Sequence, residues 1–332
     1  MYYIEFERLS LAGKKCYVDM YNQLCNMNTK ITVEGYDKNT VPKAYIAVFL
    51  DHPELFWLNG GYDGEFTERG SHKAAELNVN TWFSDLSRLR ALKKTLNDTV
   101  DKIVAGALRF STVYERVLYV HDYIVNNTVY DMKAPHRYSA MGVLIDKRAV
   151  CAGYSAAFQL VMHRLGIPCC RITGNKASST ATTTSHEWNC IEIGGKFYFV
   201  DVTWDDPTVE RPSSLDNLTH EYLCLCEKEL SRTHRISRER YVPDCTDAGL
   251  EYYRARGFYI YSYSFDTFKR IALDQMMVEG KRIQVRFSSK NELNEAVYDL
   301  IKNRRIFDIF KNTKGVTYNV SESGVVLSVL IK

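Results

Sequence analysis

Cys151, His186 and Asp201 are the residues of this 332-residue chain whose types and order suit nucleophilic catalysis by a thiol. Such catalysis needs a histidine that takes or shares the thiol proton and a carboxylate that fixes the tautomer of the imidazole. The three residues are separated by 35 and 15 positions along the chain. They can act together only if the elements that carry them bring them side by side.

Cys151 begins a predicted helix that ends before Gly166 and Pro168, which together form a stop signal. Apolar residues recur at helical spacing within it, at Tyr154, Phe158, Val161 and Leu165. The unpaired N–H groups and the macrodipole at a helix start favour a thiolate, which makes Cys151 a candidate nucleophile. On the helix context alone, a buried structural cysteine is the alternative.

His186 and Asp201 lie on two predicted strands that flank Gly194 and Gly195, the signature of a hairpin with a two-residue turn. This turn pairs Ile193 with Lys196, and in the same register His186 and Asp201 are diagonal neighbours on one face, about 7 to 8 Å apart. A β-bulge would change that relation. The alternatives are a surface histidine and a solvated aspartate, although an aspartate between two valines is poorly placed for solvation.

These segments resemble the core of the transglutaminase-like superfamily, papain-like thiol enzymes with the chain order Cys, His, Asp. The resemblance is carried by AVCAGYSAAFQLVMHRLGIPCCRITG and SHEWNCIEIGGKFYFVDVTWDDP. Upstream, VLYVHDYIVNNTVYDM and DHPELFWL resemble the leader region of bacterial members, so the similarity covers about residues 45–235. The last hundred residues are unmatched.

The resemblance implies that Cys151 is the nucleophile, His186 the general base and then acid, and Asp201 the residue that orients His186. It also implies an α+β, papain-like fold in which the cysteine helix packs on an antiparallel sheet, with N-terminal and C-terminal α/β extensions. The chemistry would be acyl transfer from a protein or peptide amide through a thioester. The backbone N–H of Cys151 is one expected oxyanion donor, and Tyr138 is a candidate for the second.

Other polar and aromatic residues have simpler interpretations. Trp188 and Trp204 flank the triad positions and either line a substrate groove or pack the core. His121 lies on the apolar face of its helix, which favours a hydrogen-bonded core histidine. The segment 205–207 is expected to form a turn rather than a calcium site. We expect no metal and no cofactor, because the chain has no CxxC pair of the kind that structural zinc sites use.

The composition limits the class of partner and compartment. A net charge of +3, from 43 basic and 40 acidic residues, is too balanced to indicate a nucleic-acid partner. No run approaches the 18 apolar residues of a membrane helix. Nine cysteines leave at least one thiol unpaired. We expect a soluble chain, secreted or at the cell surface if a signal segment was removed and otherwise cytoplasmic; the sequence does not indicate its oligomeric state.

The remaining sequence divides into elements on either side of the chemical region. Before it we expect a helix around residues 11–24, strands at ITV and AYIAVFL, a turn at NGGYDGEF, a helix over about residues 81–108, and a helix opened by the Thr112–Glu115 capping box and ending near 126–127. Beyond it we expect a helix over 267–278, a strand over 282–287, a helix over 292–302 and a strand pair around 321–324. The expected domains are 1–108, a catalytic core over 109–245, and an α/β appendage over 246–332.

The leading functional hypothesis is a cysteine protease, deamidase or transglutaminase acting on protein or peptide amides, with hydrolysis favoured over cross-linking. The alternative is a catalytically weak module of the same fold that serves protein or cell-wall binding. A glycan-releasing amidase of the superfamily is disfavoured, because its zinc-binding cysteine pairs are absent from the sequence.

Overall fold

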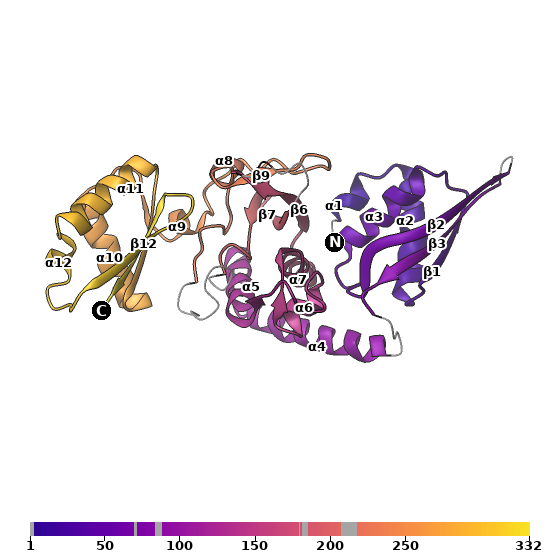
Figure 1. Ribbon diagram of the computed structural model, residues 1–332, viewed down its shortest axis with the longest axis horizontal. Helices are drawn as coiled ribbons and strands as arrows, with labels where there is room; N and C mark the ends of the chain where they lie inside the picture. Colours follow the sequence, from indigo (N-terminus) through magenta and orange to yellow (C-terminus); the bar gives the residue numbers. More distant parts are fainter. Residues whose placement is uncertain (1–2, 70–71, 84–87, 179, 181–184, 207–217) are drawn as a thin grey trace.

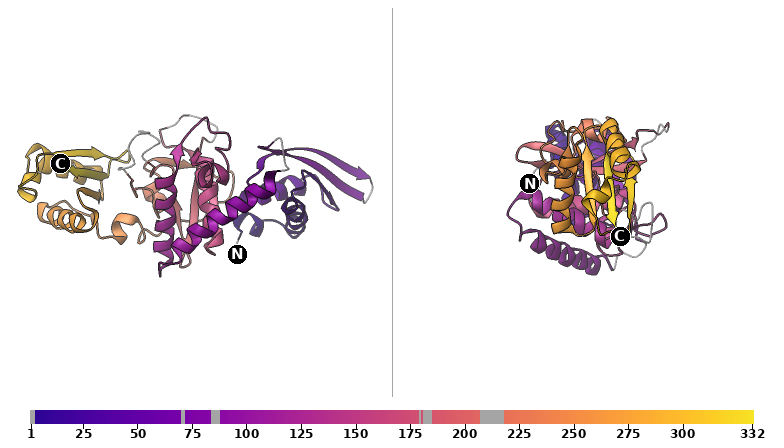
Figure 2. Two further views of the ribbon diagram at one scale, coloured as in Figure 1. Left: turned by 90° about the horizontal axis from the view of Figure 1, so that it is seen from below. Right: turned by 90° about the vertical axis from the view of Figure 1, so that its left-hand side faces the viewer.

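The computed structural model describes residues 3–69, 72–83, 88–178, 180, 185–206 and 218–332. In Figure 1 the helices and strands form three groups along the longest axis of the molecule, with the N-terminal elements at one end and the C-terminal elements at the other. Seen end-on, on the right of Figure 2, the three groups lie behind one another. Among the described residues, no helix combines the length and the apolar character needed to cross a membrane.

The N-terminal group packs helices on a three-stranded antiparallel sheet of order β1-β3-β2. Its elements are α1 (Ile4–Glu7), α2 (Leu11–Cys25), β1 (Lys30–Glu34), α3 (Thr40–Asp51), β2 (Leu58–Arg69) and β3 (His72–Thr81). In Figure 1 the β2–β3 hairpin extends beyond the body of this group. Helix α3 also contacts the central group, where the Gln159 side chain donates to the Leu50 carbonyl at 3.0 Å.

Two expectations for this region are wrong. The run AYIAVFL is not a strand but most of α3. The buried residues of this helix, which include Val41, Ala44, Tyr45 and Val48, follow helical rather than alternating spacing. The segment NGGYDGEF is not a turn but lies within β2. Its glycines are tolerated there because the strand is irregular: the register shifts between Leu58 and Tyr62, and Gly60 has a φ of 87°.

The central group joins a set of helices to a four-stranded antiparallel sheet of order β8-β7-β6-β9. Its elements are α4 (Leu89–Ala107), α5 (Val113–Asn127), β4 (Val129–Tyr130), α6 (Ala140–Leu144), β5 (Arg148–Ala149), α7 (Cys151–Arg164), β6 (Cys169–Lys176), β7 (His186–Ile193), β8 (Lys196–Val200), α8 (Glu227–Leu230) and β9 (His234–Ile236). Helix α7 packs on β6 and β7 and is surrounded by α4, α5 and α6. The left view of Figure 2 shows α4 as the long helix that runs across this group. The expected α+β fold, with the cysteine helix on an antiparallel sheet, is confirmed.

Local signals placed several boundaries of the central group correctly. The Thr112–Glu115 capping box is present, and α5 ends at Asn127. Helix α7 begins at Cys151, and Gly166, with a φ of 75°, follows its end. The helix expected over about 81–108 begins later, at Leu89 in α4; Thr81 belongs to β3, and residues 84–87 lie outside the described part of the chain.

The hairpin that carries the predicted histidine has the expected register. Gly194 and Gly195 have φ values of 61° and 79°, as a two-residue primed turn requires. Ile193 pairs with Lys196, and the pairing continues to Asn189 and Val200. Strand β8 ends there, so Asp201 directly follows the last paired residue.

The C-terminal group has its own buried apolar core and a four-stranded sheet of order β10-β11-β13-β12. Its elements are α9 (Tyr252–Ala255), β10 (Tyr259–Ile260), α10 (Phe265–Glu279), β11 (Arg282–Phe287), α11 (Lys290–Val297), the π-helical turn η4 (Tyr298–Lys302), α12 (Ile306–Ile309), β12 (Val316–Val320) and β13 (Val326–Ile331). The expected helices, strand and strand pair of this region are confirmed, while the domain boundaries stay a prediction.

Candidate active site

Cys151 is the first residue of α7 and is partly exposed. The N–H groups of Gly153 and Tyr154 donate to the Val150 carbonyl at 2.8 and 3.1 Å, and the two N–H groups before them belong to the part of a helix start that has no intrahelical acceptor. The helix start packs closely on the preceding loop, since a Cβ added at Gly153 would lie 2.4 Å from the Arg137 carbonyl oxygen. The cysteine is therefore held at a fixed helix terminus that favours negative charge.

His186 opens β7 and Asp201 follows β8, and the structure brings their side chains into contact. His186 Nε2 lies 2.5 Å from Asp201 Oδ2. The other carboxylate oxygen of Asp201 accepts from the backbone N–H groups of Thr203 and Trp204 at 3.0 and 3.1 Å. The carboxylate is wholly buried. It is thus held by the turn that follows β8 and directed at the imidazole.

The electrostatics of the site follow from this contact. Burial alone would lower the pKa of His186, but the charge and hydrogen bond of Asp201, and then the sulfur of Cys151, raise it to about 10. Burial alone would raise the pKa of Asp201, but His186 and His234 hold it well below its usual range. The interaction of His186 with both Cys151 and Asp201 joins the three residues in one group. Asp201 is hydrogen-bonded to Nε2 of His186, so Nδ1 is the ring nitrogen that remains available to the thiol.

His234 is a residue of this group that the sequence analysis did not identify. It lies on β9, two strands from β7, and its Nε2 is 3.0 Å from the same Asp201 oxygen that His186 contacts. Its Nδ1 lies 2.8 Å from the Thr233 hydroxyl. Burial outweighs the attraction of Asp201 and lowers the pKa of His234, which favours a neutral ring that donates to the carboxylate. No local pattern marks this residue, because sheet pairing alone places it there.

The aromatic residues singled out from the sequence have different surroundings. Trp204 is half-buried and packs its ring 5.5 Å from His186 and 4.2 Å from His234. Trp188 is buried in the core beneath the site, with its ring 5.6 Å from His186. Tyr138 is 39 % exposed and stacks on Trp82 at 5.5 Å. A groove role thus suits Trp204 better than Trp188.

Tyr130 is a second residue that the sequence analysis missed. It ends β4, which pairs in parallel with β5 directly before the cysteine helix. Burial, followed by the charges of Cys151 and Asp201, raises its pKa to about 12. A neutral hydroxyl-bearing ring therefore lies within electrostatic range of the thiol. Tyr138 contacts Trp82 and Arg137 and lies within electrostatic range of Tyr130.

Within the described residues, two groups of three side chains have the ligand types and the spacing to hold a metal ion: His186 with Asp201 and His234, and His121 with Asp122 and His220. The first is the group beside Cys151. The second includes His121, for which the expectation of a buried, hydrogen-bonded core histidine is confirmed. Asp205 and the residues before it form the expected turn after β8, and Pro207 lies outside the described residues.

Comparisons with known proteins show what this chain is similar to. Residues 98–202 match the transglutaminase-like superfamily. Kyphoscoliosis peptidase of Homo sapiens is 24 % identical over 191 residues, which are 53 % of this chain and 28 % of that protein. The protein of the same name from Mus musculus is 23 % identical over 213 residues, which are 57 % of this chain and 32 % of that protein. The chain thus spans about a third or less of these relatives. The crystal structure of a TGase matches with a TM-score of 0.31 and 16 % identity, covering 61 % of this chain and 56 % of that one.

Proposed function

Because residues 98–202 carry the core of the transglutaminase-like superfamily, we propose that this chain is a thiol enzyme that transfers acyl groups from protein or peptide amides. Cys151 is the nucleophile, His186 the general base and then acid, and Asp201 the residue that orients His186. The observation that carries the proposal is the 2.5 Å contact between His186 and the wholly buried Asp201. The same histidine also interacts with Cys151.

The first half of the reaction forms a thioester. Because the pKa of His186 is raised to about 10, the proton of the Cys151 thiol lies on His186 Nδ1 before substrate reacts, and the thiolate attacks the carbonyl carbon of the amide. The resulting oxyanion accepts from the N–H of Cys151 at the helix start. His186 then passes the proton to the leaving nitrogen, the C–N bond breaks, and an amine or ammonia departs. Asp201 keeps the ring in one tautomer and stabilises the imidazolium throughout.

The second half returns the free enzyme. Water or an amine attacks the thioester carbon while His186 removes its proton, and the Cys151 sulfur leaves and regains a proton. Water gives hydrolysis or deamidation, whereas an amine gives cross-linking. We favour hydrolysis, in keeping with the name of the two curated relatives, which are peptidases. The second oxyanion donor is proposed as Tyr130 or Tyr138, of which Tyr130 interacts with Cys151.

The decisive experiment compares the wild type with Cys151→Ala. A peptide carrying a thiol-reactive acyl electrophile should label the wild type once and leave the variant unlabelled. Cys25 is also partly exposed, so Cys25→Ala is the matched control and should label as the wild type does. Undiminished labelling of Cys151→Ala would falsify the proposal. Ammonia release, new peptide termini and incorporation of a fluorescent amine, scored side by side, then separate deamidase, protease and cross-linker.

The alternative function is that of a catalytically weak module of the same fold that binds proteins or cell-wall polymers. A binding module of this kind would not be labelled at Cys151 and would show no turnover in any of the three assays. It would still bind a protein or polymer partner.

A further inference from the structure

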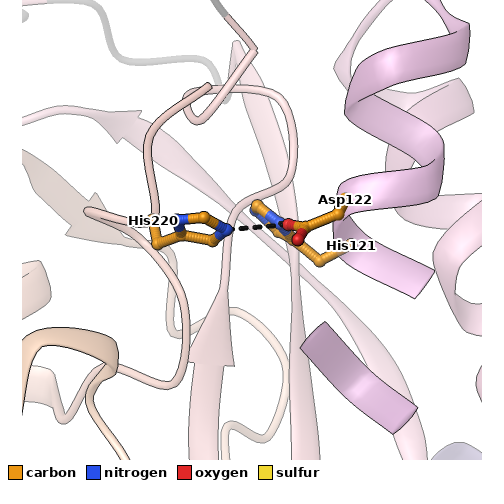
Figure 3. Close-up of side chains that lie close together, drawn as sticks. All are labelled: His121, Asp122 and His220. Atoms are coloured by element: carbon orange, nitrogen blue, oxygen red, sulfur yellow. Dashed lines mark hydrogen bonds and ion pairs between the residues drawn. The ribbon is translucent and has the colours of Figure 1, made fainter. Parts of the chain in front are cut away.

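A second cluster of histidines and carboxylates lies between α5 and the segment around His220 (Figure 3). His121 and Asp122 are consecutive residues of α5, and His220 faces them from the opposite side. His121 is fully buried and His220 is 8 % exposed. The side chains converge although His220 follows Asp122 by 98 residues, so the fold and not local sequence brings them together.

The three potential ligand atoms surround one point. Asp122 Oδ1 lies 2.9 Å from His121 Nδ1 and 2.8 Å from His220 Nε2, and all three atoms lie within 4.8 Å of one another. Zn²⁺ binds nitrogen and oxygen ligands at about 2.0 to 2.2 Å with tetrahedral geometry, which separates neighbouring ligand atoms by roughly 3.3 Å. A shift of a few tenths of an ångström in each side chain would therefore admit the ion.

The other nitrogen of His121 has the environment typical of a metal ligand. His121 Nε2 lies 3.2 Å from Asp205 Oδ2. Asp205 is itself fixed, since it accepts from the Thr219 hydroxyl at 2.6 Å and from the Tyr222 N–H at 3.0 Å. Metal-ligating histidines usually donate their second ring N–H to such a carboxylate. With that proton on Nε2, the second nitrogen of His121, Nδ1, faces Asp122, and the space between them takes either a proton or a metal ion.

The charges of the cluster fit a divalent ion. Asp122 and Asp205 supply two negative charges, which balance a divalent ion when both imidazoles bind it as neutral ligands. Without the ion, burial alone would lower the pKa of His121, but Asp122 and Asp205 raise it to about 9, so that a proton takes the place of the ion. The neighbouring Glu221 is not counted as a ligand, because its carboxylate accepts a hydrogen bond from the Ser323 hydroxyl. His220 completes the pattern: its ring stacks on Tyr252 at 4.0 Å, and its Nδ1 has no hydrogen-bond partner in the described part of the chain. That ring can therefore carry its proton on Nδ1 and present Nε2 to a metal.

We propose that His121, Asp122 and His220 bind one divalent transition-metal ion, Zn²⁺ in the first instance, with water as a fourth ligand and Asp205 as the partner that orients His121. The site connects α5 to the segment that supports Asp201. Tyr222, two residues after His220, accepts from the Asp201 N–H at 3.0 Å and donates to Asp205 at 3.0 Å. A metal there would stiffen the turn between Asp201 and Asp205 without touching substrate.

The test uses the full chain without a histidine tag, stripped with a chelator and titrated with Zn²⁺ against a chromophoric competitor. We expect one bound equivalent, at least tenfold weaker binding in His220→Gln and Asp122→Asn, and 10- to 100-fold weaker binding in Asp205→Asn. His72→Gln, which removes an exposed histidine of β3, should bind as the wild type does. Less than one equivalent bound at micromolar free Zn²⁺ would overturn the proposal.

Two further measurements separate this site from the group beside Cys151. Binding should persist in Cys151→Ala and His234→Gln; if it is lost there and kept in His220→Gln, the metal site is at the thiol and the proposal is wrong. The Co²⁺-substituted wild type should show ligand-field bands with no thiolate-to-metal charge-transfer band, and a strong charge-transfer band would overturn the assignment. This spectrum needs no variant, so the proposal stays testable if His220→Gln does not fold.

Discussion

His234 Nε2 lies 3.0 Å from Asp201 Oδ2, the same oxygen that His186 contacts at 2.5 Å. One carboxylate oxygen thus accepts from two imidazoles, and the two rings lie 5.5 Å apart. His234 does not interact with Cys151 through any contact we observe among the described residues, so it acts through Asp201. It is a positioning residue for the proposed triad.

Replacing His234 with Ala should slow alkylation of Cys151 by about 10- to 100-fold, because a hydrogen bond to a charged group contributes about 1.5–3 kcal/mol. It should also move the acid limb of the pH–rate profile to higher pH, since Asp201 loses one of the donors that hold its pKa low. His234→Gln, which keeps an N–H donor at similar reach, should recover most of the rate. A slowed rate with an unmoved profile in both variants would indicate a merely structural role.

Replacing Asp201 with Asn should lower kcat/KM, or the alkylation rate, by about 10³- to 10⁴-fold. The carboxamide cannot stabilise the imidazolium and favours the wrong tautomer of His186, which in a serine-protease triad costs on the order of 10⁴. The matched control is Asp247→Asn, because Asp247 contacts Lys196 and Tyr198 on the same hairpin but lies away from His186. Equal rates in the two variants would remove Asp201 from the proposed mechanism.

The hairpin and the cysteine helix could be predicted from sequence because short-range rules determine them. Two glycines set a two-residue turn, the turn sets the register, and the register determines which residues follow β8. A Gly stop signal and helical spacing place Cys151 at the start of α7. The α3 segment could not be predicted from sequence, because a short apolar run fits a strand and a helix equally well and its tertiary contacts decide between them.

His220 and His234 could not be predicted, because each meets its partners through pairing across the sheet or through a long connection. Asp201 and His234 are 33 residues apart, and Asp122 and His220 are 98 apart. Neither histidine lies in a motif whose spacing implies a contact. The same is true of Tyr130, which reaches the site through a two-residue parallel strand pair.

The ion pair of His186 predicts a pH dependence of stability with a defined sign. The pKa of His186 is raised from 6.5 to about 10 in the folded chain, so the folded state binds the extra proton between these values. Its stabilising contribution is complete below about pH 6.5 and is lost as the pH rises towards 10. The free energy of unfolding of the wild type, relative to His186→Gln, should therefore fall across this window. His121 is present in both proteins and cancels from the difference. A constant difference between pH 6.5 and 10 would contradict the assignment.

The close packing at the start of α7 predicts that Gly153→Ala is damaging. The added Cβ would lie 2.4 Å from the Arg137 carbonyl oxygen and 2.8 Å from the Ala149 Cβ, so the backbone must move. Overpacking of this kind costs about 1–3 kcal/mol, and here it also displaces Cys151. Both the melting temperature and the alkylation rate should fall. In Gly315→Ala, where no atom lies within 4 Å of the added Cβ, both should stay close to the wild-type values.

The buried contacts of Arg286 lead us to expect that this residue holds the C-terminal group to the rest of the chain. It lies on β11, is 1 % exposed, and donates to Glu229 of α8 at 2.8 Å and to the Glu221 carbonyl at 3.1 Å. Burial alone would raise the pKa of Glu229, but Arg286 and Arg254 lower it to about 2. Arg286→Met leaves a buried carboxylate without its main partner, and breaking such a pair costs about 3–5 kcal/mol. Urea unfolding should therefore begin at lower denaturant concentration.

The matched variant Arg305→Met breaks the ion pair with Asp299, in which the arginine is 44 % exposed, and should change the free energy of unfolding by less than about 1 kcal/mol. Similar midpoints for the two variants would show that the Arg286 contacts do not hold the C-terminal group in place.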